Sequence, residues 1–388
     1  MTALKIGHFT DSFPPVINGV STLVTELHAE LLAHGEESHV FTTGPAHNVT
    51  LDAPHVWRSN GVRLGTSPFY ANPWLNLKSR RMARALDVMH AHDSLAIGTV
   101  AARLSHAWRK PLVFTHHTRH DIYVLNFPRR LIPLLRAYAF GTVRLLMRAS
   151  TITTAPSSDA ARWLKNLSPQ YADRVRVLHN GARLERFDNL DDQLARDDFG
   201  IGPEQTIFIT VSRLAPEKNL SAFAEALIKA VNDGAQAHWL VLGDGPSRPK
   251  LEAQVAPIHD RVRFFGAIPN ARIGSYLTMA DVCAITSLSE TNCISAIEGM
   301  ACGLPYLGVQ ADWWEDFTVG HGLEAGLIAQ RSTEELACAI RRLCDDVPLR
   351  ARMGAQAKRL SRKFDIRTIT QQWLALYREL APARLEGD

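Results

Sequence analysis

The sequence predicts an α/β protein built from two doubly wound domains, each with a parallel β-sheet. Short apolar runs alternate with longer amphipathic runs from end to end of the chain, which is the βαβ rhythm of a parallel sheet covered by helices. With 388 residues, the chain is long enough for two domains with sizeable cores. The acidic and less apolar stretch 186–199 indicates a linker between the two halves.

The apolar runs are the strand candidates, and we expect ligands where the carboxyl ends of such strands meet, at an opening shared by the two domains. We expect a first domain at 1–185, a linker at 186–204 and a second domain at 205–365. The first half contains candidate strands at 4–10, 38–43, 87–92, 111–117, 150–156 and 175–181. The second half contains candidate strands at 206–213, 238–245, 262–267, 281–287 and 305–310.

The composition is that of a globular protein, with 46% apolar and 21% charged residues. No apolar run approaches the length of a membrane-spanning helix, and the first residues show no signal-peptide pattern, so we expect a cytoplasmic protein. The five cysteines are odd in number and form no C-x-x-C pair. They therefore favour reduced core thiols over a disulfide framework or a zinc site.

Charge is distributed unevenly along the chain. Residues 1–190 contain 22 Lys and Arg against 13 Asp and Glu, a balance of +9, although the whole chain carries only +4. A basic first half favours an acidic partner, either an anionic membrane surface or a nucleic acid, unless the excess is simply scattered over a solvated face. We expect no nucleic acid, because the chain has no recognised binding module and no basic stretch interleaved with aromatic residues.

Glu290 and Glu298 lie on either side of a predicted helix start. An apolar strand at 281–287 leads into a short loop with Glu290, and a helix that begins near Ile294 carries Glu298 in its first turns. The helix N-terminus offers unpaired N–H groups that suit a phosphate, and two carboxylates accept hydrogen bonds from hydroxyl groups. A sugar nucleotide supplies both groups, whereas the spacing alone is also compatible with two solvated glutamates.

Arg213 and Lys218 occupy a turn between a buried strand and a helix, in the run VSRLAPEKNL. The guanidinium can fork across two oxygens of a diphosphate while the ammonium acts as a point charge. Two surface cations that cap a loop are the alternative. Near the N-terminus, Gly19 follows the first strand and precedes a helix, which allows close approach of the backbone to an anionic ligand.

Several histidines cluster around the strand at 111–117, in the run THHTRHDIY and in His90 and His92. His117 is the candidate for hydrogen bonding to a sugar hydroxyl or for orienting an acceptor. The alternatives are His116, His120, His90 and His92. A zinc site is conceivable from so many histidines, but no ligand spacing supports it, and we expect no metal.

The segment 127–149 has a strong amphipathic pattern as a helix, and Pro133 indicates that its regular part starts there. The apolar side could lie on an anionic bilayer, or it could cover the sheet while the arginines are solvated. On a helical wheel the arginines fall within one 120° arc: Arg129, Arg130, Arg136, Arg144 and Arg148. The opposite side carries Leu131, Leu134, Leu135, Tyr138, Leu145 and Leu146.

Taken together, these motifs resemble the retaining family 4 glycosyltransferases. Glu290 and Glu298 match the E-x7-E signature of the family, and Arg213 with Lys218 matches its R…K pair. Further matches are Asn18-Gly19-Val20 after the first strand, His117-Thr118, the G-x-G-P turn at Gly243-Asp244-Gly245-Pro246, and Phe264-Phe265-Gly266. The glycine turn is not the G-x-G-x-x-G fingerprint of a dehydrogenase.

The resemblance implies a GT-B fold, with the helix near 366–380 packed back on the first domain. It implies that Arg213 and Lys218 hold the leaving diphosphate in place of a metal, and that His117 lies beside the transferred sugar. Glu290 would then touch that sugar, and Glu298 would hold the ribose hydroxyls. The remaining donor contacts implied by the resemblance are Gly19, Gly243, Gly245, Phe265, Thr291 and Asn292.

The start TDS-F-P-P-x-x-N-G-V, the stretch HHT-x-x-D-x-Y and SET…E are most similar to diacylglycerol glucosyltransferases. The resemblance implies transfer of a hexose, glucose in the first instance, from a UDP- or GDP-sugar to a membrane lipid, without a cofactor, at the inner face of the cell membrane. Asp121 and Tyr123 would lie near the acceptor, and Arg136, Arg144 and Arg148 near the membrane. A mannosyltransferase acting on phosphatidylinositol or a soluble sugar, and a non-catalytic sugar-nucleotide-binding protein, remain open.

Overall fold

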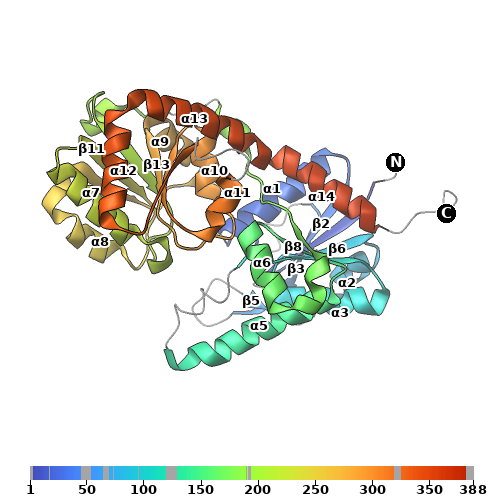
Figure 1. The fold of residues 1–388 in the computed structure, drawn as a ribbon. Helices are drawn as coiled ribbons and strands as arrows, with labels where there is room; N and C mark the ends of the chain where they lie inside the picture. Colours follow the sequence, from blue (N-terminus) through green and yellow to red (C-terminus); the bar gives the residue numbers. More distant parts are fainter. Residues whose placement is uncertain are drawn as a thin grey trace. The chain divides into compact units, whose positions relative to one another are not determined.

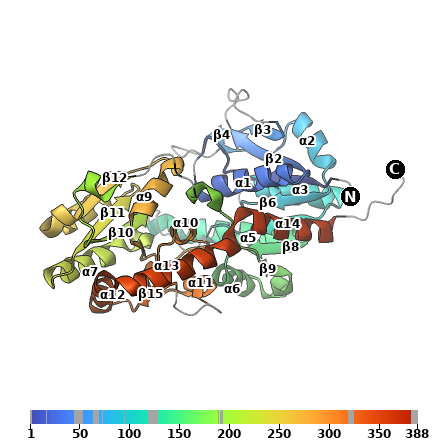
Figure 2. The ribbon, with the colours of Figure 1, turned by 90° about the horizontal axis from the view of Figure 1, so that it is seen from above.

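The structure is a computed structural model, and the chain divides into two compact units. Unit 1 comprises Met1–Gly181 and Ile366–Asp388, and unit 2 comprises Ala182–Asp365. Each unit contains a parallel β-sheet covered by helices (Figures 1 and 2). The residues described are 3–16, 18–44, 54–63, 70–72, 74–94, 96–118, 129–188, 190, 194–318 and 325–381.

The sheet of unit 1 has seven parallel strands in the order β3-β2-β1-β6-β7-β8-β9. All six candidate strands of the first half are present. The sequence missed β3, because this edge strand reads VWRSN and lacks a continuous apolar run. The strands are β1 (Lys5–Phe9), β2 (Glu37–Gly44), β3 (Val56–Asn60), β6 (Val88–Ala91), β7 (Leu112–Thr115), β8 (Ile152–Ala155) and β9 (Val175–Val177). A small antiparallel pair is formed by β4 (Val62–Arg63) and β5 (Tyr70–Ala71).

Helices cover both faces of this sheet. On one face, α2, α3, α5 and α6 pack around a core that includes Phe9, Phe114 and Leu146. On the other face, α1 and α14 pack around Ile6 and Trp373, and the two helices lie side by side in Figure 1. The helices are α1 (Gly19–Ala33), α2 (Leu77–Arg84), α3 (Ala96–Trp108), α5 (Ile132–Ala149), α6 (Ser158–Leu167) and α14 (Ile366–Leu380).

The sheet of unit 2 has six parallel strands in the order β12-β11-β10-β13-β14-β15. All five candidate strands of the second half are present, and β15 adds a short edge strand that the sequence pattern did not reveal. The strands are β10 (Thr206–Val211), β11 (Ala237–Leu242), β12 (Val262–Gly266), β13 (Val282–Ile285), β14 (Tyr306–Val309) and β15 (Gly326–Ala329).

Two hydrophobic cores hold the helices of unit 2 on its sheet. Phe223 of α7 and Ile340 of α12 pack with Trp239 on one face, and Ile297 of α10 packs with Ile209 on the other. The helices are α7 (Leu220–Asn232), α8 (Arg248–Gln254), α9 (Ile273–Met279), α10 (Ile294–Ala301), α11 (Glu315–Thr318), α12 (Thr333–Asp345) and α13 (Val347–Ser361).

The segment that the sequence assigned to a linker, 186–204, belongs to unit 2. Phe187 and Ile201 are 6% and 1% exposed and lie in one of its cores, which places the division at Gly181. The chain leaves unit 2 beside its point of entry, where the Ala182 amide donates to the Phe364 carbonyl at 2.9 Å.

Both sheets are doubly wound, as the sequence predicts. The strand order reverses between β1 and β6 in unit 1 and between β10 and β13 in unit 2. Ligands of such folds bind at this switch point, beyond the carboxyl ends of the strands. Among the helices in the described part of the chain, none combines the length and the apolar character needed to cross a membrane.

Candidate active site

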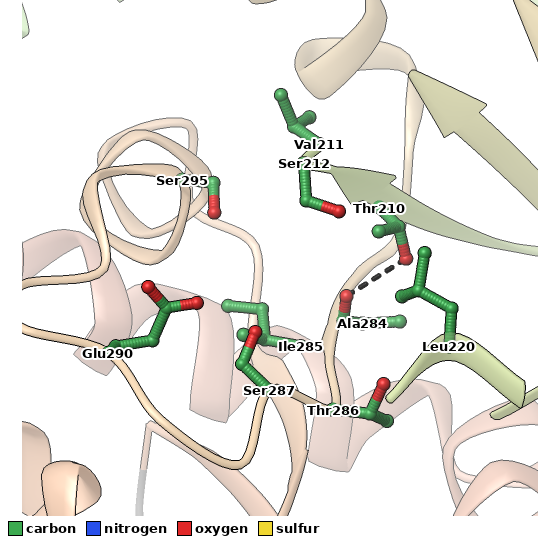
Figure 3. Close-up of a pocket in the computed structure, with 10 residues that line it drawn as sticks. All are labelled: Thr210, Val211, Ser212, Leu220, Ala284, Ile285, Thr286, Ser287, Glu290 and Ser295. Atoms are coloured by element: carbon green, nitrogen blue, oxygen red, sulfur yellow. Dashed lines mark hydrogen bonds between the residues drawn. The ribbon is translucent and has the colours of Figure 1, made fainter. Parts of the chain in front are cut away.

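A small pocket lies at the switch point of unit 2, between the ends of β10 and β13 (Figure 3). Its lining includes Ser212 at the end of β10, Ser287 and Glu290 after β13, and Ser295 in the first turn of α10. The Ser212 hydroxyl is buried and has no hydrogen-bond partner in the described part of unit 2. The pocket therefore brings a carboxylate, small hydroxyls and a helix N-terminus together, which are groups that suit a polar, phosphorylated ligand.

Lys218 and Glu290 form an ion pair beside this pocket, with Lys218 Nζ 2.6 Å from Glu290 Oε1. Lys218 ends the short 3₁₀ turn after β10, and Glu290 follows β13, so the pair joins the two strands at the switch point. The side chains are only 20% and 12% exposed. Burial is the largest single influence on the pKa of Lys218 and lowers it, but the charges of Glu290, Cys293 and Glu217 and the hydrogen bond to Glu290 together outweigh burial, and the net shift is upward.

Arg213 lies on the same loop as Lys218 but is much more open to solvent. Its side chain is 53% exposed, and its guanidinium forms an ion pair with Glu217 one helical turn away in sequence. An exposed pair of this kind contributes little to stability. The guanidinium can therefore exchange Glu217 for another anion at small cost, whereas Lys218 is held by a buried partner.

Glu298 is the more deeply buried of the two glutamates, at 4% exposed, and it pairs with Arg186. Arg186 belongs to the segment that enters unit 2, and its guanidinium lies 4.7 Å from the centre of the Phe187 ring. The sequence did not single out Arg186, which is separated from Glu298 by 112 positions. Only the fold brings the two side chains together, so their spacing along the chain could not predict the ion pair.

The glycine turn after β11 lies directly against the loop that carries Arg213. Gly243 has φ +130°, and a Cβ there would lie 1.8 Å from the Ser212 carbonyl oxygen. A Cβ at Gly245 would lie 2.4 Å from the Leu214 carbonyl oxygen. Only glycine permits this contact between two backbones, so the turn fixes the position of the Arg213 loop.

The remaining predicted donor residues of unit 2 lie near the same carboxyl edge of its sheet. The ring of Phe265 packs against Phe199 and Tyr276, with ring centres 5.6 and 5.0 Å apart, so its side chain is used for packing. Thr291 and Asn292 lie in the loop between Glu290 and the start of α10. The structure thus brings the predicted residues of unit 2 to one edge of its sheet.

In unit 1, His117 follows β7 and is 8% exposed. Its Nε2 lies 3.1 Å from His92 Nδ1, while its own Nδ1 is buried and has no partner among the described residues. Burial lowers the pKa of His117 to about 3, so the ring is neutral at physiological pH. Gly19 begins α1, and a Cβ at this position would meet no atom within 4 Å, so packing within unit 1 does not require glycine there.

Two buried carboxyl groups at the switch point of unit 1 escaped the sequence reasoning. Asp93 Oδ2 accepts hydrogen bonds from Thr10 Oγ1 at 2.8 Å and from the Asp11 amide at 2.7 Å. Burial and then the charge of Asp93 raise the pKa of Asp11 well above its ordinary range, and burial also raises the pKa of Asp93. Their position directly after β1 and β6 was the available signal.

His8, His90 and His92 form a cluster whose ligand atoms lie within 4.8 Å of one another. Sequence spacing did not reveal this group, which matches the donor type of a metal site. Hydrogen bonds to His117, Tyr377 and other neighbours already involve every ring nitrogen of the cluster except His8 Nε2. The nitrogens are therefore used in hydrogen bonding, and we derive no chemistry from a metal there.

α5 covers the sheet and leaves its arginines in solvent, as one of the two alternatives predicts, but the face that it buries is not the expected one. The face packed on the sheet consists of Ala139, Val143, Leu146 and Met147. Leu134, Tyr138 and Leu145, which were expected on an apolar face, are 70%, 58% and 49% exposed. The arginines Arg136, Arg144 and Arg148 are also exposed. The buried face is offset from the expected apolar side, so α5 leaves an apolar stripe and basic side chains in solvent. Asp121 and Tyr123 lie outside the described residues.

Comparison with known proteins identifies the class of enzyme. The family model described as Glycosyltransferase Family 4 matches residues 17–186, and the one described as Glycosyl transferases group 1 matches residues 191–360. The chain is 26% identical to the alpha-monoglucosyldiacylglycerol synthase of Acholeplasma laidlawii, covering 81% of this chain and 82% of that protein. It is 30% identical to the 2-deoxystreptamine glucosyltransferase of Streptomyces kanamyceticus, covering 73% and 74% respectively.

Solved structures also have a similar fold. The crystal structure of Anabaena Alr3699/HepE in complex with UDP and glucose superposes with a TM-score of 0.74 at 21% identity, covering 97% of this chain and 100% of that chain. The two doubly wound units therefore have the GT-B fold. The chain belongs to glycosyltransferase family 4.

Proposed function

We propose that the protein transfers glucose, with retention of configuration and without a metal, from UDP-glucose to a hydroxyl group of a membrane lipid such as diacylglycerol. The observation that carries this proposal is the arrangement at the switch point of unit 2. There Lys218 and Arg213 provide cations at the edge that also carries Glu290 and Glu298. A diphosphate needs such cations, and a sugar and a ribose need such carboxylates.

The two cations are suited to different tasks. Lys218 is buried beside Glu290, so an incoming phosphate would meet a fixed ammonium whose raised pKa keeps it charged. Arg213 is exposed, so its guanidinium can turn from Glu217 to the phosphate oxygens. Together they would stabilise the charge that develops on the leaving diphosphate, which is the role that a metal plays in other transferases.

The proposed reaction is a front-face displacement. The bond between C1 of glucose and the phosphate oxygen breaks, and the acceptor oxygen forms its bond to C1 from the same face. The hydroxyl proton passes to the departing phosphate. Because the acceptor oxygen itself bonds to C1, no protein carboxylate acts as a covalent nucleophile. Glu290 would hold hydroxyls of the sugar and Glu298 those of the ribose, with Arg186 holding Glu298 in place.

Glucose and UDP are supported by the relatives. Two proteins similar to this chain are named for glucosyl transfer, and a structural neighbour was solved with UDP and glucose. These names describe the donors and products of those proteins and not of this one. Activity with a panel of sugar nucleotides therefore tests whether UDP-glucose is the donor here. We expect product from UDP-glucose, and product from GDP-mannose alone would replace it with the mannosyltransferase alternative.

The lipid acceptor is supported by α5 and by one relative. Leu134, Tyr138 and Leu145 form an exposed apolar stripe, and Arg144 and Arg148 lie along its side. Exposed apolar side chains beside cations are typical of helices that lie on anionic bilayers. The relative in Acholeplasma laidlawii is named for a lipid product.

Liposome sedimentation tests this acceptor. Replacing Arg136, Arg144 and Arg148 with serine should reduce binding to anionic vesicles, because each basic residue near the surface contributes about 1 kcal/mol. Binding of the unchanged protein should weaken as salt rises, and transfer to lipid should fall in the variant while hydrolysis of UDP-glucose persists. A control variant with serine at Arg352, Lys358 and Arg359 of α13 loses the same charge and should sediment normally. Equal binding of both variants would contradict the membrane role of α5.

A soluble acceptor is the second candidate. It is favoured by the relative named 2-deoxystreptamine glucosyltransferase, which has the higher identity of the two. Incubation of UDP-glucose with mixed lipid vesicles or with soluble sugars and aminocyclitols, followed by mass spectrometry, separates the candidates. Product only with soluble acceptors would overturn the lipid assignment, and donor binding without any product would leave a sugar-nucleotide-binding protein.

A further inference from the structure

Three buried histidines form a continuous chain of ring nitrogens across the sheet of unit 1. His8 lies on β1, His92 follows β6 and His117 follows β7, and these three strands are neighbours in the sheet. His8 Nδ1 lies 3.0 Å from His92 Nε2, and His92 Nδ1 lies 3.1 Å from His117 Nε2. The two ends of this row of hydrogen-bonded histidines are His8 Nε2 and His117 Nδ1, both buried without a partner in the described part of the protein.

All three rings are neutral at physiological pH. Burial lowers the pKa of His8 and of His117 to about 3, and burial together with neighbouring histidines lowers that of His92 well below its ordinary value. A neutral imidazole carries one N–H donor and one acceptor nitrogen. Each of the two hydrogen bonds in the chain needs one donor and one acceptor, so the position of one proton determines the other two.

Only two arrangements satisfy both hydrogen bonds. In the first, every ring is protonated on Nδ1, so His8 donates to His92, His92 donates to His117, and His117 Nδ1 presents a free N–H. In the second, every ring is protonated on Nε2, so the donors point the other way, His8 Nε2 carries a proton, and His117 Nδ1 presents a lone pair. The two ends of the chain are therefore coupled.

The surroundings of His8 favour the first arrangement. His8 is 0% exposed, and its Nε2 has no hydrogen-bond partner in the described part of unit 1 although His39 and Tyr377 are among its neighbours. His117 is 8% exposed and follows β7. An N–H group that is buried without an acceptor is rarer and more costly than a buried acceptor without a donor. One end of the row must carry an unpaired N–H, and only His117, beyond the carboxyl end of β7, lies where the oxygen of a ligand can accept it. His8 Nε2 is therefore expected to carry no proton, which places the proton of His117 on Nδ1.

We propose that His8 and His92 are positioning residues that hold His117 in its Nδ1–H tautomer, so that His117 donates a hydrogen bond to an oxygen of a ligand bound at the carboxyl edge of the unit 1 sheet. The proposal rests on the proposed function for the identity of that ligand. The tautomer itself depends only on unit 1. His117 then serves as a donor, and it does not serve as a base that removes the acceptor proton.

The tautomer is measured directly by NMR of protein labelled with ¹⁵N in histidine, because the two ring nitrogens have different shifts when protonated and unprotonated. His117→Gln and His92→Asn assign the signals by their loss. We expect both rings to be neutral Nδ1–H tautomers from pH 6 to pH 8. Nε2–H tautomers, or a ring that gains charge in this range, would overturn the proposal. One equivalent of tightly bound zinc in the purified protein would also overturn it, since a metal would occupy the lone pairs of the cluster.

Enzyme kinetics test whether His92 affects turnover through His117. His92→Phe removes the donor to His117 Nε2 and should lower kcat for glucosyl transfer about tenfold, with a smaller change in the KM of the donor. His92→Asn restores an N–H near the position of Nδ1 and should recover most of this loss. In a His117→Ala background, His92→Phe should cause no further loss. The control His28→Gln alters another buried histidine, bonded to Ser38 and outside the chain, and should turn over normally.

The outcomes separate this proposal from the proposed function. Nδ1–H tautomers combined with losses that simply add in the double variant would show that the chain exists but does not act through His117. If His92→Phe does not fold, the comparison of His92→Asn with the unchanged protein and the NMR spectra still decide. Absence of transfer from every sugar nucleotide would refute the proposed function while leaving the tautomer measurement valid.

Discussion

Replacing Lys218 with methionine separates the structural role of its ion pair from its proposed catalytic role. The substitution keeps a long unbranched side chain but removes the ammonium 2.6 Å from Glu290. Two consequences follow in unit 2. Glu290 keeps a charge that is largely buried and has lost this partner, and the leaving diphosphate would lose one of the two cations proposed to hold it.

The loss of stability can be worked out from the burial of the pair. Breaking a fully buried ion pair costs about 3–5 kcal/mol. Here the side chains remain 20% and 12% exposed, so solvent screens part of the charge, and we expect about 2–3 kcal/mol. For a unit of this size, 1 kcal/mol shifts Tm by about 2–4 °C, so the transition of unit 2 should fall by about 4–12 °C.

Adding Glu290→Gln to Lys218→Met removes the stranded charge. The Tm of unit 2 should then return most of the way to that of the unchanged protein. Turnover should stay low, because loss of one donor opposite a developing charge costs about 10²–10³ in rate. Differential scanning calorimetry and initial rates with UDP-glucose measure the two effects. If turnover recovers together with stability, or if Lys218→Met alone retains normal turnover, the cation has no part in catalysis.

Two further predictions concern carboxyl groups. Glu298→Gln should mainly raise the KM of the donor, and Glu290→Gln should mainly lower kcat; wild-type kinetics in both would make the two glutamates purely structural. Burial and Asp93 raise the pKa of Asp11, so the folded state binds this proton more tightly than the unfolded state, and stability falls as pH rises from 3.8 toward the raised value. Asp11→Asn should therefore unfold at a higher temperature than the unchanged protein at pH 7, by a margin that shrinks toward pH 4; a margin independent of pH would contradict this.

The sequence predicted the parts of this molecule that depend on local pattern. The apolar runs around β1 and β10 were recognisable because parallel strands are buried on both faces. The turn carrying Arg213 and Lys218 follows such a strand directly, so its place at the carboxyl edge of the sheet could be inferred. The edge strand β3 was missed because its residues are mixed in polarity.

The parts that escaped prediction depend on which distant segments meet. The partner of Glu298 is Arg186, and no periodicity links them. The wheel of α5 showed an apolar side, but the sheet packs against a different face, Ala139, Val143, Leu146 and Met147, which only the tertiary fold selects. The hydrogen-bonded histidines from His8 to His117 come together only because β1, β6 and β7 are adjacent. The sequence of a single strand does not determine which strands are its neighbours.

The most direct test of the account is product analysis after incubation with UDP-glucose and anionic vesicles that contain diacylglycerol, in the presence of a strong chelator. The account predicts an α-glucosyl lipid, identified by its mass and by the anomeric coupling in its proton NMR spectrum, with loss of product when Arg213 and Lys218 are both replaced by alanine. A β-linked product, transfer that requires an added divalent metal, or undiminished product from that double variant would contradict it.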